Sequence, residues 1–139
     1  MGKDLYDNYA IAKEVYTRVD NALEFKISEL IFDVHQEELN RTSNAQPAIM
    51  ATSIAYFEVL KKLGIIDLDN VKFMAGHSLG EYCAMFSAGV MSLESTLRAI
   101  QKRADLMSET KGGAMAAVLN ASEEVLKTAL VEGNKIGYV

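Results

Sequence analysis

The segment Gly76-His77-Ser78-Leu79-Gly80 restricts the fold of this chain more than any other part of the sequence. It matches the pattern G-x-S-x-G, in which a serine stands on a sharp turn between a strand and the helix that follows it. Residues 71–75 are short and mostly apolar and predict a buried strand. Residues 79–87 contain helix-forming residues and end before Gly89. We therefore expect Ser78 at the junction of a strand and a helix.

Ser78 at such a turn is a candidate catalytic nucleophile. The turn forces a strained backbone on the serine, and Gly76 and Gly80 leave room for the strand and the helix to approach each other. The amide of Leu79 and the positive end of the following helix would face the oxyanion that forms on an acyl group attacked by Ser78. The alternative interpretation is an ordinary tight turn that contains an incidental serine.

A serine nucleophile needs a general base, and the sequence contains two histidines. His77 adjoins the nucleophile, so its side chain should point away from Ser78 and form a wall of the site rather than act as the base. His35 lies in a polar stretch and is expected to be a solvated side chain. The sequence therefore presents a nucleophile without an evident base.

Helical periodicity is clearest before the motif. Residues 7–23 carry Ile11, Val15, Val19 and Leu23 at a spacing of four, which predicts an amphipathic helix with these side chains on one face.

A second helix is predicted over residues 45–63, after a polar surface connection at residues 35–43. Asn44 is its candidate cap, Pro47 is tolerated early in a helix, and Gly64 supplies a left-handed stop.

The chain after the motif is predicted to change character at Lys111-Gly112-Gly113. Before this break, Ser92 caps a predicted helix that ends near residue 108. Beyond it, residues 114–119 predict a strand, residues 122–131 a helix ended by Gly133, and residues 136–139 the start of another strand. The two glycines are a plausible subdomain boundary.

Composition excludes several classes of function. The 139 residues suit one soluble domain, and 14 basic against 19 acidic residues give a net charge of -5 without a basic cluster, which argues against nucleic-acid binding. No apolar run is long enough to span a bilayer, and no metal site is predicted.

Cys83 is the only cysteine of the sequence. A single cysteine fits a reducing, cytoplasmic setting, and Cys83 is expected to be a small core residue rather than a reactive thiol.

Five segments carry a family resemblance. They are, in chain order, Met1-Gly2-Lys3-Asp4-Leu5-Tyr6, Asn44-Ala45-Gln46-Pro47-Ala48, the motif extended to Glu81, Lys102-Arg103-Ala104-Asp105-Leu106-Met107, and Gly113-Ala114-Met115-Ala116-Ala117-Val118. Together they resemble the malonyl-CoA:acyl carrier protein transacylases and the related acyltransferase domains of fatty-acid and polyketide synthases. The resemblance covers essentially the whole chain.

The resemblance implies a ping-pong transfer in fatty acid biosynthesis. Ser78 would take malonyl from coenzyme A and pass it to the phosphopantetheine thiol of acyl carrier protein, with no cofactor beyond the thioester substrate. The arginine that pairs with the malonyl carboxylate falls on Arg103, although Ala104 stands where the family more often has glycine. Gln46 matches a glutamine beside the family's active site, or is simply a polar residue of a helix. Arg103 could likewise be an ordinary surface arginine.

The resemblance also implies parts that these residues do not supply. The family carries a strand and a glycine- and glutamine-rich loop with an oxyanion donor before the segment like Met1-Gly2-Lys3, and a catalytic histidine after the position of Val139. The isolated chain is therefore expected to be inactive, and self-association or a complementing chain is expected.

The fold class expected is α/β, with a partial hydrolase-like parallel sheet, flanking helices and the start of a small ferredoxin-like subdomain. Residues 1–112 would belong to the acyltransferase core and residues 113–139 to the subdomain. Two other functions fit the motif: a plain serine hydrolase, which has no use for Arg103 as a carboxylate clamp, and a non-catalytic fragment that binds a partner chain.

Overall fold

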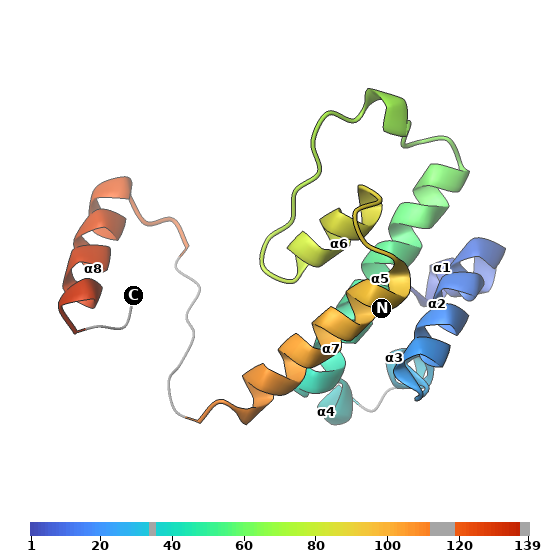
Figure 1. Ribbon diagram of the computed structural model, residues 1–139, viewed down its shortest axis with the longest axis horizontal. Coiled ribbons are helices and arrows are strands. Elements are labelled where there is room, and N and C mark those ends of the chain that lie inside the picture. The colour runs from blue at the N-terminus through green and yellow to red at the C-terminus, as the bar shows by residue number, and fades with distance from the viewer. Residues whose placement is uncertain (34–35, 112–118, 137–139) are drawn as a thin grey trace.

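The computed structural model describes residues 1–33, 36–111 and 119–136, and these residues form helices joined by loops, without a β-strand (Figure 1). The elements are α1 (Lys3–Asn8), α2 (Ala10–Leu23), α3 (Ile27–Phe32), α4 (Gln36–Leu39), α5 (Thr42–Lys62), the 3-10 turn η1 (Leu68–Asn70), α6 (Gly80–Ser87), α7 (Leu93–Glu109) and α8 (Glu123–Ile136).

Helix α5 is the centre of the core, because it packs against both α2 and α7. In Figure 1, α1 to α3 lie on one side of α5 and α6 lies on the other. The core side chains are almost completely buried and come from all three central helices; they include Val19, Met50, Ile54, Leu97 and Ile100. Burial of this apolar surface is the main force that holds the helices together.

A buried tyrosine ties α2 to α5. The Tyr16 hydroxyl donates a hydrogen bond of 3.1 Å to Thr52 Oγ1, and Thr52 in turn donates to the Ala48 carbonyl. Burial raises the pKa of Tyr16, so the ring stays neutral and keeps its proton for this bond.

The helix predicted over residues 7–23 is confirmed as α2, with Val15 and Val19 buried and Ile11 and Leu23 packed against the core. It begins at Ala10 because Tyr9 is extended and separates it from α1. The helices ending at Gly64 and beginning after Ser92 are also confirmed: Gly64 has a φ of 69°, and the Ser92 side chain accepts from the Ser95 amide at 3.1 Å.

The start of α5 differs from the prediction. The helix begins at Thr42, and Asn44 lies within it instead of capping it, donating a side-chain hydrogen bond to the Glu38 carbonyl at 3.0 Å. The polar stretch before it, expected to be a surface connection, contains α4, whose Leu39 is buried. One buried leucine among polar residues was too weak a periodic signal to predict this helix.

The predicted α/β fold class is wrong for the described residues. Residues 71–76, expected to be a buried central strand, are irregular, and Phe73 within them is 93% exposed. A strand exists only through hydrogen bonds to a neighbouring strand, and none of the described segments offers one.

The predicted ferredoxin-like start is likewise not seen. Residues 114–118 and 137–139, expected to be strands, lie outside the described residues, as does the predicted boundary at Gly112-Gly113. Ile136, expected to open a strand, instead ends α8, which also continues through Gly133. Helix formers on both sides of this glycine outweigh its modest cost within a helix.

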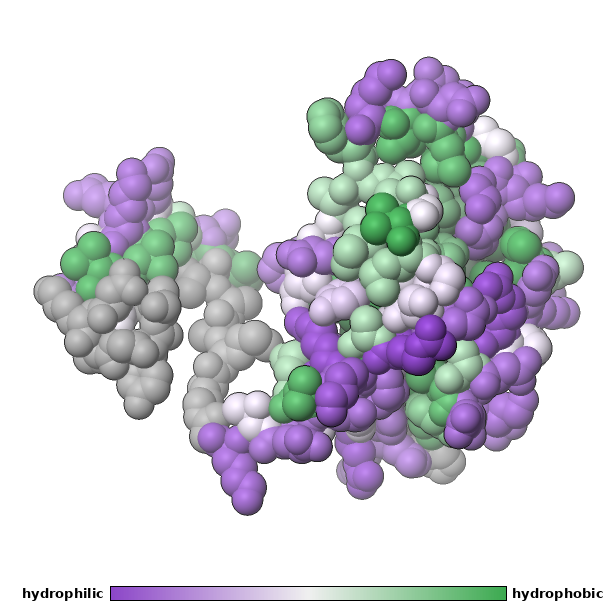
Figure 2. All heavy atoms as spheres, in the orientation of Figure 1, coloured by the Kyte–Doolittle hydropathy of each residue, from purple (hydrophilic) through white to green (hydrophobic). Residues whose placement is uncertain are grey.

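Apolar side chains are exposed around α6 and the segment before it (Figure 2). Ile65 is 66% exposed and Val90 is 71% exposed, in addition to Phe73. Within the described ranges, no helix combines the length and apolar character needed to cross a membrane.

Candidate active site

Ser78 has the strained backbone expected at a nucleophile elbow. Its φ is +53°, in the left-handed region that side chains other than glycine rarely adopt. The turn leads directly into α6, and the Ser78 carbonyl accepts from the Glu81 amide at 3.2 Å. The local sequence thus produces the sharp turn even where the preceding segment has no strand partner.

The two glycines of the motif have different roles. A Cβ atom added to Gly76 would lie 1.9 Å from the Gly80 carbonyl oxygen, so no side chain fits there. A Cβ atom added to Gly80 would meet no described atom within 4 Å. Close approach therefore explains Gly76, whereas the predicted crowding at Gly80 is not present among the described residues.

Arg103 reaches the candidate nucleophile from α7. Its Nη2 donates a hydrogen bond of 2.8 Å to Ser78 Oγ, across 25 residues of sequence. Its Nη1 donates to Gln46 Oε1 on α5. Three residues singled out in the sequence, on three different segments, therefore meet at one point.

Gln46 is buried, with 8% of its surface exposed, and both ends of its amide are occupied. Its Oε1 accepts from Arg103, and its Nε2 lies 3.4 Å from Met107 Sδ, which acts as a weak acceptor. Met107 lies one turn beyond Arg103 on α7 and was not predicted; its spacing of four from Arg103 was the available signal. The amide thereby fixes the orientation of the guanidinium.

Leu79 and His77 flank the nucleophile. Leu79 packs against the core, and its amide donates no backbone hydrogen bond within the described ranges, which leaves it free for an incoming oxyanion. His77 is exposed and forms no hydrogen bond with Ser78 in the part of the chain that the structure describes. His35 lies outside the described residues.

Residues 1–133 match the model of the acyl transferase domain. The chain belongs to this family. The resemblance predicted from the five segments is therefore confirmed.

Curated relatives of this acyl transferase domain are malonyl CoA-acyl carrier protein transacylases. The protein of Bacillus subtilis (strain 168) is 45% identical over 130 residues, which cover 91% of this chain and 40% of the relative. That of Staphylococcus aureus (strain COL) is 39% identical over 122 residues, covering 86% of this chain and 38% of the relative. The chain thus spans about 40% of the length of the curated relatives it matches.

Solved structures similar to this chain are also malonyltransferases. An acyl-carrier-protein-S-malonyltransferase from Bartonella henselae superposes with a TM-score of 0.82 at 37% identity, over 99% of this chain and 45% of that one. A second, from Vibrio cholerae, gives a TM-score of 0.84 at 32% identity, over 96% of this chain and 44% of that one. A malonyl-transacylase in complex with a type II PKS acyl-carrier protein gives 0.72 at 33% identity, over 78% of this chain and 34% of that one.

Gln101 supports the site of this acyl transferase domain from α7. Pro47 has no N–H, so the Ser43 carbonyl loses the partner that a helix would normally supply. Gln101 Nε2 lies 3.4 Å from that carbonyl and 2.9 Å from Asp105 Oδ1. The side chain thus links α7 to the first turn of α5, directly beside Gln46.

Cys83 lies on α6, half-buried against the core. Burial raises the pKa of its thiol, and a hydrogen bond with Ser53 offsets part of that effect. A thiol with a raised pKa holds little thiolate at neutral pH, in accord with the predicted structural role.

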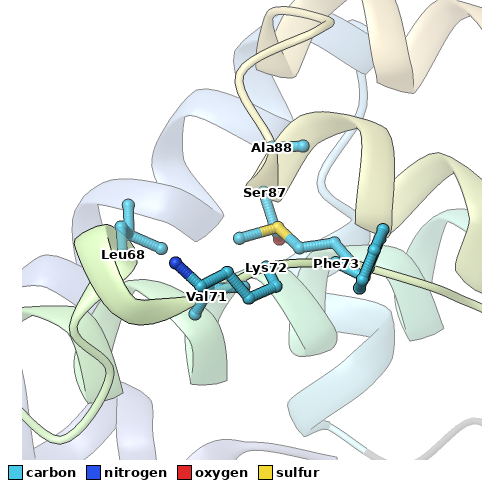
Figure 3. Close-up of a pocket in the computed structure, with 7 residues that line it drawn as sticks. Leu68, Val71, Lys72, Phe73, Ser87 and Ala88 are labelled. Atoms are coloured by element: carbon cyan, nitrogen blue, oxygen red, sulfur yellow. The ribbon is translucent and has the colours of Figure 1, made fainter.

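Several hollows flank the segment that leads to the elbow, and two of them are lined by its side chains Val71 and Phe73. One of about 530 Å³ is lined by side chains of α5 and α6, including Phe57 and Cys83, and by Gly76. The other, of about 250 Å³, lies between residues 68–74 and the end of α6 and is drawn in Figure 3, where Leu68 and Phe73 lie at opposite ends of the hollow with Val71 and Lys72 between them. Neither is lined by Ser78 or Arg103, and no group of three potential metal ligands occurs in the described ranges.

Proposed function

We propose that this chain provides the nucleophile and the carboxylate-binding group of an acyltransferase that moves malonyl from coenzyme A to acyl carrier protein in fatty acid biosynthesis. The observation that carries the proposal is the contact of Arg103 with Ser78 Oγ at 2.8 Å, with the guanidinium held by the buried Gln46. The names of the relatives, which act with coenzyme A and acyl carrier protein, support it.

The proposed reaction has two transfers. Ser78 Oγ attacks the thioester carbonyl carbon of malonyl-CoA, the C–S bond breaks, and the hydroxyl proton ends on the thiol of coenzyme A. The thiol of the acyl carrier protein then attacks the ester and returns the proton to Ser78. The Leu79 amide, at the positive end of α6, would donate to the oxyanion in both steps. The thioester supplies the activated acyl group, so no cofactor is needed.

Arg103 would select the substrate. A malonyl group carries a free carboxylate, and leaving it unpaired in a partly buried site costs free energy. A guanidinium presents two parallel N–H donors to such a carboxylate. Arg103 is half-buried and Gln46 holds it close to Ser78, so the carboxylate of an acyl group attached to Ser78 would lie near the guanidinium.

Turnover by this chain alone should be slow. Within the described ranges, neither a histidine nor a carboxylate forms a hydrogen bond with Ser78. A positioned base typically contributes a factor of about 10² or more. The location we propose is the cytoplasm, a reducing compartment that suits a protein with one unpaired cysteine.

The test is acylation of Ser78 in the 139-residue chain by malonyl-CoA and by acetyl-CoA, followed by peptide mass spectrometry, with Ser78→Ala as the control. Malonylation in excess of acetylation, with slow transfer to acyl carrier protein, supports the proposal. Acylation by both donors followed by release to water indicates a serine hydrolase. No acylation, together with binding of acyl carrier protein, indicates a non-catalytic fragment.

A further inference from the structure

We infer that Arg103 is also a latch on the nucleophile, which a substrate carboxylate releases. The inference deepens the proposed function and rests on the use of Ser78 as the nucleophile. It starts from the direction of one hydrogen bond: the guanidinium has no acceptor, so in the contact of 2.8 Å Arg103 Nη2 donates and Ser78 Oγ accepts.

A hydroxyl oxygen that accepts from a cation is a poor nucleophile. One of the two lone pairs of Ser78 Oγ is engaged by the N–H group, and the positive charge draws electron density from the oxygen that must attack the carbonyl carbon. As the neutral hydroxyl attacks, its oxygen becomes more positive until the proton leaves, and a guanidinium at hydrogen-bond distance opposes this charge. The contact thus holds Ser78 unreactive in the free protein.

Both donors of the guanidinium edge are occupied in the free site. Nη1 donates to Gln46, and Gln46 is buried, so the guanidinium has little freedom to turn toward another partner. Ser78, by contrast, is exposed, so its contact with Nη2 can be exchanged for a partner from solvent.

A carboxylate is that partner. It is a stronger acceptor than a hydroxyl for a guanidinium N–H, because it carries a negative charge. When the malonyl carboxylate takes Nη2, Ser78 Oγ no longer accepts from the cation, and both of its lone pairs are free beside the thioester carbonyl. An acyl group without a carboxylate leaves Arg103 bound to Ser78. Arg103 would therefore favour malonyl over uncharged acyl groups in two ways, by binding the malonyl carboxylate and by making Ser78 reactive only when that carboxylate is bound.

The latch can be tested without a malonyl donor. p-Nitrophenyl acetate is an activated, uncharged ester, and its acetyl group moves to Ser78 Oγ as p-nitrophenol leaves with the hydroxyl proton. Formate is the smallest carboxylate and can occupy Arg103 from solution. The rate of Ser78 acetylation is measured with rising formate at constant ionic strength, chloride being the replaced anion, and the rate of Ser78→Ala is subtracted.

We expect formate to accelerate acetylation of the unmodified chain by roughly tenfold or more, the lower end of what one hydrogen bond from a charged donor contributes. Arg103→Met, which keeps the apolar stem, should start at the higher rate and not respond to formate. Arg98→Ala is the matched control: Arg98 lies on the same helix, exposed and bonded to Ser95, and its loss should leave the formate response intact.

The inference fails if formate slows the unmodified chain or leaves it unchanged, if formate accelerates Arg103→Met equally, or if Ser78 takes no acetyl group in either protein. These failures are distinct from failure of the proposed function. A chain that prefers malonyl-CoA but ignores formate keeps the function and loses the latch. A chain that responds to formate but labels equally with malonyl-CoA and acetyl-CoA keeps the latch and loses the function.

Discussion

The guanidinium of Arg103 contacts both Ser78, the candidate nucleophile, and the buried amide of Gln46. Substitutions of Arg103 therefore test whether it binds the substrate carboxylate or only supports the packing around Gln46. Ser78 could be selected from the motif G-x-S-x-G, and Arg103 could be selected because its segment resembles the family. The distance between Ser78 and Arg103 could not be predicted from the sequence, because it depends on how α7 packs against α5.

Arg103→Ala is expected to reduce malonylation of Ser78 by orders of magnitude while acetylation is kept or improved. The reason is that the malonyl carboxylate loses its partner, whereas an acetyl group never needed one. Arg103→Lys should recover only part of the loss, because an ammonium cannot present two parallel donors. Mass spectrometry of Ser78 with each donor gives both rates; equal losses for the two donors would assign Arg103 a structural role.

Gly76→Ala and Gly80→Ala form a matched pair within the motif. The first places Cβ 1.9 Å from a backbone oxygen and should cost several kcal/mol or more, an amount typical of severe steric clashes. The second meets no described atom and replaces a helical glycine, so it should be neutral or stabilise by about 0.5–1 kcal/mol. Urea unfolding of both variants measures the difference. A destabilised Gly80→Ala would show that further atoms approach this position in solution.

At the scale of elements, the pairing of α5 with α7 decides the site. Pro47 frees the Ser43 carbonyl, Gln101 supplies a donor to it, and Gln46 lies in the same turn. Sequence patterns predicted both helices but not this link, because a proline in a helix shows which carbonyl is freed and not which distant side chain reaches it.

Gln101→Glu is expected to destabilise the fold by about 1–3 kcal/mol at pH 7, because a carboxylate cannot donate to Ser43 and lies beside Asp105. These neighbours raise the pKa of the introduced carboxyl, so the cost is present at neutral pH and falls as pH drops and the group is protonated. Urea unfolding at pH 7 and pH 4 measures this.

Gln101→Met is the control for that experiment. It removes the same donors without adding charge, and it also removes the buried Gln101 Oε1, which has no hydrogen-bond partner within the described ranges. Its cost should be smaller and should not depend on pH. A pH-dependent cost for Gln101→Met would mean that charge at residue 101 is not the cause.

For the whole molecule, the exposed apolar surface is the main consequence of the fold. Phe73 is 93% exposed, and α8 exposes Val125, Leu126, Leu130 and Val131. Burying such surface on a partner gains roughly 25 cal/mol per Å². The 139-residue chain alone is therefore expected to self-associate, which size-exclusion chromatography with light scattering would show as a mass above 15.3 kDa. A stable monomer with one cooperative thermal transition would contradict this.

The sequence by itself determined the features that depend on neighbours in the chain. The turn at Ser78, the cap at Ser92, the stop at Gly64 and the apolar face of α2 all follow from residues a few positions apart, and all were predicted correctly. Family membership followed from short segments of the same kind.

Only the tertiary structure decided the features that need a partner distant in sequence. Residues 71–75 have the composition of a buried strand, yet composition supplies no neighbour for their backbone, and they remain irregular and exposed in the described structure. The meeting of Arg103, Gln46 and Ser78 likewise depends on side chains from three segments that the packing of α5, α6 and α7 brings together. Local backbone preferences act within a few residues, whereas pairing and burial require the whole core.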